Sequence, residues 1–420
     1  MRRLLAIGLI WLGCSLAWLV LGSTLLVRSD ETFSRLGDGV FALWGPPMRQ
    51  LPPRAVALEP RDPAAAPATA AAARDVPLAG SDIEVTLDLE HRKKGLVWFP
   101  TYGVDFRARY SFENPDAASR DVTLELPLES EHALYDGFDV TEDDKSVGAE
   151  VKQGVARWTT RLAPHQKKSY EVRYRSRGTS RWQYDLTSGT GNVRDFRLAL
   201  STDFEEVNFL PGTLSPSKHE TGAGGWRGSW EFKTLVASSP IGLALPERIN
   251  PGPLASKITF FAPVSLLFFF FVVAILAHAQ KKLLHPLHYL FLGCAFFAFH
   301  LLFAYLVDHV SIAPSFAIAA AVSTALVVSY ARLFVGWRFA LREIGVSQLL
   351  YLVLFSFTFF WTGFTGLAIT VGAILTLFVL MQITGRRDLS EGESSLEPHA
   401  ACATPYRCAV ARDARESGVT

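Results

Sequence analysis

Five ionisable side chains lie in or beside one apolar segment, and their spacing could support proton transfer. His285 and His288 are three residues apart, so on a helix they share one face. His300 lies in the middle of the same segment, and Asp308 and His309 close its far end. Ionisable groups inside a membrane are costly and often mark proton or ion paths. These residues therefore predict one functional possibility, a proton relay along a single helix.

A structural interpretation of the same residues competes with the relay. His300 would hydrogen-bond a neighbouring helix, and the other three histidines would lie at the membrane surfaces. No Asp or Glu falls inside an apolar segment, because Asp308 and Glu343 stand at edges or in loops. A coupled transporter usually needs such a carboxylate in its path. The structural interpretation is therefore favoured.

Motifs of enzymes and metal sites are incomplete in this chain. Ser215-Pro216-Ser217-Lys218 matches S-x-x-K, but the S-D-N and K-T-G elements that accompany it are missing. Gly189-Thr190-Gly191 lacks the third glycine of a nucleotide loop. Cys402 and Cys408, in the polar tail, are read as incidental thiols. We therefore expect no catalytic, cofactor-binding or metal-ligating residues, no cofactor and no enzymatic activity.

The elements that position these residues are membrane spans, each of which needs about 20 apolar residues. Six segments qualify: Leu4–Val27, Ile258–Ala279, Leu287–Val307, Val310–Ala331, Val346–Trp361 and Phe364–Gln382. The first could be a cleaved signal peptide, but its apolar run exceeds the about 7–15 residues of such a peptide. A retained anchor is favoured. The fold prediction is a membrane protein with one N-terminal and five C-terminal transmembrane helices.

The basic residues between the spans predict the orientation. Ahead of the first span and within and just after residues 258–385, the basic clusters fall on one side of the membrane: Arg2, Arg3, Lys281, Lys282, Arg332, Arg338, Arg342, Arg386 and Arg387. The gaps at 308–311 and 362–365 contain neither Lys nor Arg. By the positive-inside rule, both termini are then cytoplasmic and residues 28–257 are external. The chain is therefore predicted to cross the membrane several times; its location in a bacterial inner membrane is implied only by a family resemblance carried by other residues.

The external part is predicted to consist of three segments. An N-terminal span over 1–27 is followed at 28–58 by an amphipathic helix, Glu31–Trp44, and a Pro-rich stretch. The helix would lie at the outer membrane face or against the bundle. It would end at Gly45-Pro46-Pro47, because proline has no N–H to donate. Residues 59–79 are an Ala/Pro-rich linker. Residues 80–245 alternate apolar and polar positions between turn signals, which predicts a periplasmic antiparallel β-sandwich-like domain.

The remaining segments return the chain to the membrane. Residues 246–257 form a stiff re-entry linker, 258–385 a five-helix bundle, and 386–420 a disordered cytoplasmic tail without periodicity. Four residues are expected at the lipid interface: Trp44, Trp337, Arg338 and Arg342. The last three belong to an amphipathic loop, 332–345, predicted to lie on anionic headgroups. The alternative for this loop is a docking site for a cytoplasmic protein.

Two groups of residues resemble the CreD-type inner-membrane proteins. In the bundle, His285-Pro286-Leu287-His288-Tyr289-Leu290 opens a span, Asp308-His309 follows it, and a span rich in small residues comes next. Near the start, Leu43-Trp44-Gly45 with Gln50 and Pro52 is similar to the family's W-G-x-x-Q…P segment. The resemblance covers 31–53 and about 258–387, whereas 80–240 matches less well, so the chain resembles a divergent member. It implies a non-enzymatic protein of envelope maintenance or stress response, with no catalytic residues to carry over.

Two functions from different classes therefore stand as expectations. The first is a membrane protein that presents a periplasmic β domain to an envelope protein partner, with membrane lipids as its other partners. The alternative is a subunit of a transporter or channel, with a proton path along the span that contains His300. The formal net charge of +1 gives no reason to expect a nucleic-acid partner.

Overall fold

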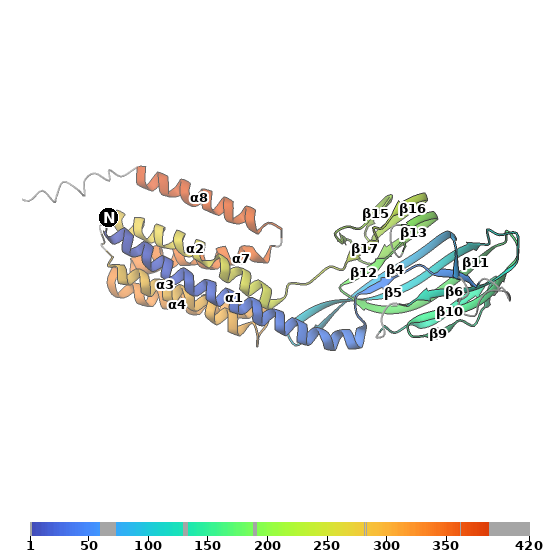
Figure 1. Ribbon diagram of the computed structural model, residues 1–420. Helices are drawn as coiled ribbons and strands as arrows, with labels where there is room; N and C mark the ends of the chain where they lie inside the picture. The colour runs from blue at the N-terminus through green and yellow to red at the C-terminus, as the bar shows by residue number, and fades with distance from the viewer. Residues whose placement is uncertain are drawn as a thin grey trace, which may run out of the picture. The chain divides into compact units, whose positions relative to one another are not determined.

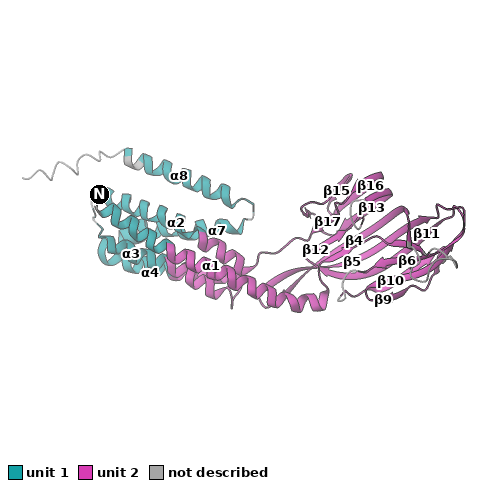
Figure 2. Cartoon of the chain, viewed as in Figure 1, with its two compact units in different colours: residues 1–15, 261–296, 323–420 teal, residues 16–260, 297–322 magenta. Residues whose placement is uncertain are grey.

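The computed structural model describes residues 2–58, 73–128, 133–187, 191–280, 282, 284–361 and 363–385 of the chain. The predicted tail, the two tail cysteines and most of the Ala/Pro linker lie outside these residues. The chain forms two compact units (Figure 2). The helical unit comprises Met1–Ser15, Phe261–Phe296 and Ser323–Thr420, and the mixed unit comprises Leu16–Phe260 and Phe297–Val322.

Six helical segments of the described residues are long and apolar enough to cross a membrane, which confirms the number of predicted spans. They are α1 (Arg2–Trp44), α2 (Pro251–Ala279), α3 (Pro286–Leu306), α4 (Ile312–Val335), the segment Trp337–Phe360, and α8 (Thr365–Gly385), as Figure 1 shows. One stands at the N-terminus and five follow the strands. The predicted arrangement of one plus five helices is therefore present.

Helix α1 differs from the prediction, because it is one unbroken helix of 43 residues. A span ending at Val27 and a separate amphipathic helix beginning at Glu31 were expected. The residues between them include no glycine or proline, so nothing in the sequence interrupts the hydrogen-bond ladder. The predicted end at Trp44 is correct. Gly45 follows with φ of 86°, the left-handed conformation that commonly closes a helix.

Two other predicted boundaries are also wrong. Helix α2 begins at Pro251 rather than at residue 258, so the re-entry linker is helical over its second half. Proline suits the first turn of a helix, because the N–H it lacks would have no partner there. The predicted interfacial loop 332–345 belongs to two helices, which meet at Gly336 with φ of 84°. Glu343 therefore lies within a helix and not in a loop.

The fifth span is an irregular helix. It alternates between α, π and 3₁₀ geometry in short pieces: α5 (Trp337–Phe339), η1 (Ala340–Gly345), α6 (Val346–Gln348), η2 (Leu349–Leu354), α7 (Phe355–Phe357) and η3 (Thr358–Phe360). It begins nine residues before the predicted start at Val346. Short π segments occur often at functional positions in helices.

Between α1 and α2 the chain forms a strand-rich β domain, residues 48–244, in three sheets. Their strand orders are β15-β16-β13-β4-β5-β11-β7-β8, β3-β2-β6-β10-β9 and β1-β12-β17-β14. The strands are β1 (Met48–Gln50), β2 (Arg54–Leu58), β3 (Ala73–Val76), β4 (Leu78–Lys94), β5 (Val97–Glu113), β6 (Arg120–Pro127), β7 (Asp136–Glu142), β8 (Lys145–Ser146), β9 (Glu150–Lys152), β10 (Val155–Leu162), β11 (Lys167–Thr179), β12 (Arg181–Tyr184), β13 (Gly191–Thr202), β14 (Asn208–Phe209), β15 (Lys218–Gly222), β16 (Gly225–Ala237) and β17 (Ile241–Ala244).

The β domain differs from the prediction in its extent and its pairing. It begins with β1 and β2, ahead of the predicted linker, and β3 lies inside the linker range. Most neighbouring strands are antiparallel, but β1 pairs parallel to β12 and β13 pairs parallel to β4. An alternating pattern shows which face of a strand is buried, but it does not show which strand lies beside it.

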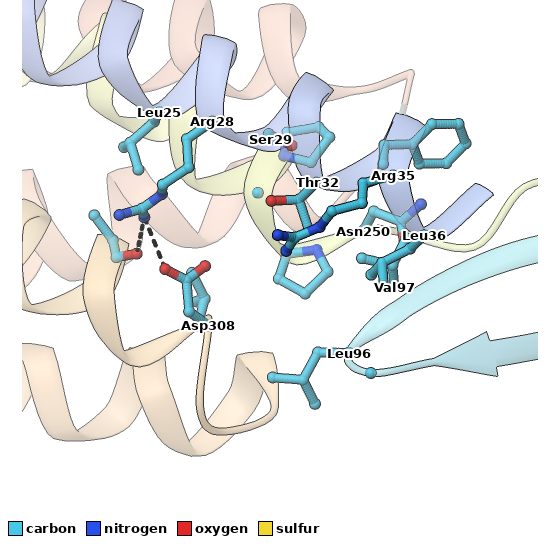
Figure 3. A pocket seen from close by; sticks show the side chains of 17 residues that line it. Leu25, Arg28, Ser29, Thr32, Arg35, Leu36, Leu96, Val97, Asn250 and Asp308 are labelled. Atoms are coloured by element: carbon cyan, nitrogen blue, oxygen red, sulfur yellow. Dashed lines mark hydrogen bonds and ion pairs between the residues drawn. The ribbon is translucent and has the colours of Figure 1, made fainter. Parts of the chain in front are cut away.

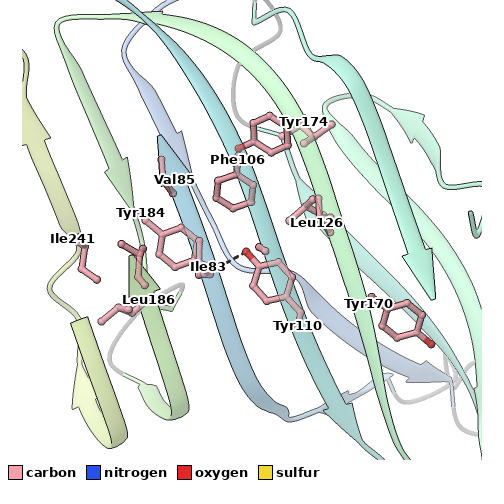
Figure 4. Close-up of a cluster of buried hydrophobic side chains, with 14 of the residues drawn as sticks. Ile83, Val85, Phe106, Tyr110, Leu126, Tyr170, Tyr174, Tyr184, Leu186 and Ile241 are labelled. Atoms are coloured by element: carbon pink, nitrogen blue, oxygen red, sulfur yellow. Dashed lines mark hydrogen bonds between the residues drawn. The ribbon is translucent and has the colours of Figure 1, made fainter. Parts of the chain in front are cut away.

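The core of the β domain combines aliphatic side chains with hydrogen-bonded tyrosines (Figure 4). Ile83 and Val85 point into it from β4, as the alternation predicted. The Tyr174 hydroxyl donates to Gln50 Oε1 at 2.7 Å, and the Tyr110 and Tyr184 hydroxyls lie 3.2 Å apart. Buried hydroxyls of this kind need partners, because an unpaired one costs free energy. The network ties β1 to the large sheet.

Candidate functional site

The two histidines at the start of α3 lie in different surroundings. His288 Nδ1 is 2.9 Å from the Tyr330 hydroxyl. Its ring stacks on Phe334, with centroids 4.0 Å apart. His285 is exposed, and its Nδ1 accepts a hydrogen bond from the backbone N–H of Leu287 at 3.3 Å. One histidine therefore packs against α4, and the other occupies the helix start.

His300 is buried among aromatic rings of the mixed unit. Its side chain is 1% exposed. Trp18 of α1 meets it edge to face at 5.6 Å, and Phe299 does so at 4.9 Å. The ring thus lies at the contact between α1 and α3, and the expected hydrogen bond to a neighbouring helix stays a prediction.

At the far end of α3, Asp308 is joined to α1. Arg28 Nη2 lies 2.9 Å from Asp308 Oδ2 and also donates to the Ala304 carbonyl at 3.0 Å. The same guanidinium lies over the Tyr305 ring, 5.1 Å from its centroid. His309 is exposed beside this contact. The partner of Asp308 could not be predicted from the sequence, since the two residues are 280 positions apart.

The five residues are spread along α3 rather than gathered at one place. Twelve positions separate His288 from His300, which amounts to about 18 Å of helical rise. Proton transfer between side chains requires hydrogen-bond distances or a bridging water. Among the described residues, no three His, Cys, Asp or Glu side chains are placed to hold a metal ion. A functional role for these residues stays a prediction.

The C-terminal third of α1 packs on the β domain, which is a different contact from the predicted one with lipid or bundle. The Phe33 ring lies 4.8 Å from that of Phe99. Trp44 lies between two guanidiniums, at 4.2 Å from Arg92 and 4.8 Å from Arg177. Such contacts are cation–π interactions. Trp44 therefore joins α1 to the sheet, and its place at the lipid interface stays a prediction.

The other three predicted interface residues lie at the start of the fifth span. Trp337 is 57% exposed, and Arg338 and Arg342 are exposed with it. Exposed Trp and Arg near a helix end are typical of membrane–water interfaces. Their contact with lipid stays a prediction.

A cleft that the sequence did not predict opens beside α1 in the mixed unit (Figure 3). We call it the α1 cleft. It has a volume of ≈ 320 Å³ and is bordered by α1, the β4–β5 turn, the start of α2 and the end of α3. The α1 residues that line it recur at helical spacing: Leu25, Arg28, Ser29, Thr32, Phe33, Arg35 and Leu36. That spacing puts them on one face of the helix.

Comparison with known protein families shows to which family this chain belongs. The family model described as "Inner membrane protein CreD" matches residues 81–389. The match includes most of the β domain, which the resemblance had covered less well, and it excludes 31–53. No curated protein matches the chain.

Two solved structures are similar to parts of the chain. A Legionella pneumophila protein named as nutrient binding shares 12% identity, at a TM-score of 0.32, over 52% of this chain and 75% of that chain. An M1 zinc metallopeptidase from Deinococcus radiodurans shares 8% identity, at a TM-score of 0.27, over 66% of this chain and 94% of that chain. Both TM-scores are too low to bear on fold or function. The family match alone is extensive, and the chain belongs to the CreD family of inner membrane proteins.

Proposed function

We propose that this protein is a non-enzymatic component of the cell envelope that presents its β domain on the periplasmic side and supports envelope integrity or a stress response. In this role the β domain binds an envelope protein, and the apolar helices hold it at the membrane. Membership of an inner-membrane family supports the location. The continuity of α1 supports a mechanical connection between the apolar helices and the β domain.

The observation that carries the proposal is the unbroken course of α1 from its apolar run to the β domain. A helix transmits displacement along its axis better than a flexible linker does. In the mixed unit, the end of α1 is fixed by Trp44 between Arg92 and Arg177. The Thr179 hydroxyl also donates to the Gly45 carbonyl at 3.2 Å. In this proposal a displacement of α1 at its membrane end would be transmitted to the sheet, and a displacement of the sheet would be transmitted back along α1.

A second candidate, transport, is favoured by one feature of the helical unit. Gln348 is fully buried in the irregular fifth span and donates to the Ser323 hydroxyl at 3.0 Å. The Ser265 hydroxyl donates to the Tyr351 carbonyl within the second π segment. Polar groups inside a membrane bundle often mark ion or proton paths. In this alternative the path would use these residues or the histidines of α3.

Complementation of a deletion strain tests the first proposal. Asp30 is exposed on α1, between its apolar run and the segment packed on the sheet. Asp30→Pro should interrupt the helix there, at a cost of about 3 kcal/mol, whereas the matched control Asp30→Ala keeps it continuous. We expect Asp30→Ala to restore detergent resistance and Asp30→Pro to fail at an equal protein level in the membrane. Full protection by Asp30→Pro, or a deletion strain without an envelope defect, would contradict the proposal.

A further inference from the structure

The α1 cleft lies where three apolar helices of the mixed unit give way to polar residues. On α1 the apolar run ends at Val27 and Arg28 follows. Helix α3 ends at Leu306, just before Asp308. Helix α2 begins at Pro251, which also lines the cleft. A membrane changes from hydrocarbon to headgroups at the level where spans make this transition. The cleft is therefore at headgroup level.

The polar lining of the cleft suits an anion. It contains two guanidiniums, Arg28 and Arg35, and one carboxylate, Asp308, so one positive charge is in excess. The Ser29 and Thr32 hydroxyls lie on the same face of α1 between the two arginines. Arg28 is held in place by Asp308 at 2.9 Å. Arg35 is exposed, and Figure 3 shows its side chain running along the cleft toward Thr32.

The apolar lining suits a ligand that has hydrocarbon as well as charge. Leu25 and Val307 line the cleft but are only 3% and 1% exposed, so the apolar surface open to a ligand is that of the half-buried Leu96, in the β4–β5 turn, and Val97, at the start of β5. A free inorganic anion gains nothing from such surfaces, whereas an acyl chain or glycerol group gains free energy by covering them.

The turn that borders the cleft has the composition of a membrane-surface anchor. Lys93 and Lys94 precede Gly95, and Leu96, Val97 and Trp98 follow it. The guanidinium of Arg248 lies 4.5 Å from the centroid of the Trp98 ring. Lys93 is exposed, and Leu96, Val97 and Trp98 are half-buried. Basic residues near a membrane are attracted to anionic lipid surfaces. The positive charge of the cleft arginines therefore has further basic residues close to it in the chain segments that border the cleft.

From this juxtaposition we propose that the α1 cleft binds the phosphate headgroup of an anionic phospholipid. Arg35 binds the phosphate oxygens, for which its planar guanidinium is suited. Ser29 and Thr32 donate to the same headgroup, and Arg28 adds charge while it stays paired with Asp308. The glycerol group and the first part of the acyl chains cover Leu96 and Val97. The bound lipid would then join α1, α3 and the β4–β5 turn at one point.

Native mass spectrometry of the full-length protein tests the proposal. The protein is released from nanodiscs that contain equal amounts of phosphatidylglycerol and phosphatidylcholine, and the lipids that stay bound are counted. We expect phosphatidylglycerol to be enriched. Arg35→Gln should reduce the enrichment about tenfold, which corresponds to the loss of one charge-assisted contact, and Arg35→Lys should keep most of it. The matched control is Arg161→Gln, which removes an exposed arginine of β10 that lies 3.9 Å from Asp121.

Two results would overturn the proposal. Equal enrichment in Arg35→Gln and in the Arg161→Gln control would show that the cleft does not select the lipid. Displacement of bound phosphatidylglycerol by millimolar inorganic phosphate would show a site for the free ion rather than for a lipid. Retention of the lipid under inorganic phosphate, together with its loss in Arg35→Gln, supports the lipid.

Discussion

The indole of Trp18 meets the imidazole of His300 edge to face, with ring centroids 5.6 Å apart and ring planes at 89°. This contact joins α1 to α3 at a point where both side chains are buried. It gives His300 a packing role that does not depend on titration. Aromatic pairs in this geometry contribute about 0.5–1.5 kcal/mol beyond the area they bury.

The first prediction separates the packing role of His300 from a proton relay. His300→Gln keeps a donor and an acceptor, but glutamine does not titrate near neutral pH. We expect the variant to restore envelope resistance in a deletion strain at a normal protein level. Loss of protection by a stably inserted variant would favour the transport alternative. Tyr305→Phe, at an exposed position of α3, is the matched control for a change in the same helix.

The second prediction concerns orientation. The positive-inside pattern places the β domain outside and the tail inside. A cysteine introduced at Leu134, which is exposed on the β domain, should react with a membrane-impermeant maleimide in intact spheroplasts. The native thiols of Cys402 and Cys408 should react only after lysis, as mass spectrometry of the labelled peptides would report. Labelling of the tail thiols in intact spheroplasts would reverse the assigned sides.

The spans and the strands were predictable because each depends on local pattern. The apolar runs determine the six helices, and the alternation over 83–89 determines which face of β4 is buried. Helix boundaries were less predictable. The stretch around Asp30 is polar and looks like a surface connection, yet no residue there breaks a helix, and α1 continues through it.

The candidate site was less predictable, because its contacts are distant in sequence. Arg28 and Asp308 form an ion pair across 280 positions, and each residue alone has the appearance of an ordinary interfacial charge. Trp44 likewise resembles a lipid anchor until Arg92 and Arg177 are placed on either side of it. Pairings of this kind follow from the arrangement of the sheets, which an alternating pattern does not specify.

The third prediction is a loss of stability of the β domain at alkaline pH. Burial raises the pKa of four core tyrosines, namely Tyr102, Tyr110, Tyr174 and Tyr184, above the usual value. Above about pH 10, the unfolded chain loses these phenolic protons while the folded domain keeps them. The folded state then binds more protons, so the free energy of unfolding falls as pH rises. Below that pH these tyrosines keep their protons in both states, so they add no pH dependence to the free energy of unfolding.

Absorbance at 295 nm checks this prediction, because it reports tyrosinate. Exposed tyrosines should titrate first and reversibly, and the buried ones should titrate together with the loss of the β-sheet circular dichroism signal. Titration of all the tyrosines in one step near pH 10, with the sheet signal intact, would contradict the burial of the hydroxyl network.

The fourth prediction tests a hydrogen bond of that network. Tyr174→Phe removes the donor to Gln50 Oε1 and leaves the ring in place against Phe106, whose centroid is 4.7 Å away. An acceptor left unsatisfied in a core costs about 1–3 kcal/mol. We expect a lower thermal midpoint of the β domain by differential scanning calorimetry of the full chain. The double variant with Gln50→Leu removes the unsatisfied amide, and a coupling energy of zero between the two changes would contradict the bond.

The last prediction concerns the attachment of α1 to the sheet. Trp44→Ala removes the ring that lies between Arg92 and Arg177 and leaves two guanidiniums 4.2 and 4.8 Å from an empty position. Each cation–π contact contributes about 0.5–2 kcal/mol, depending on its exposure. The neighbouring Leu43 is 69% exposed, so Leu43→Ala is a matched control that shortens a side chain on the free face of the same helix turn. Limited proteolysis of the full chain in detergent should show new cleavage near Gly45 in Trp44→Ala alone. Equal cleavage of the two variants would mean that Trp44 does not anchor α1. Cleavage restricted to Trp44→Ala would identify this aromatic contact as the point where α1 is fixed to the β domain.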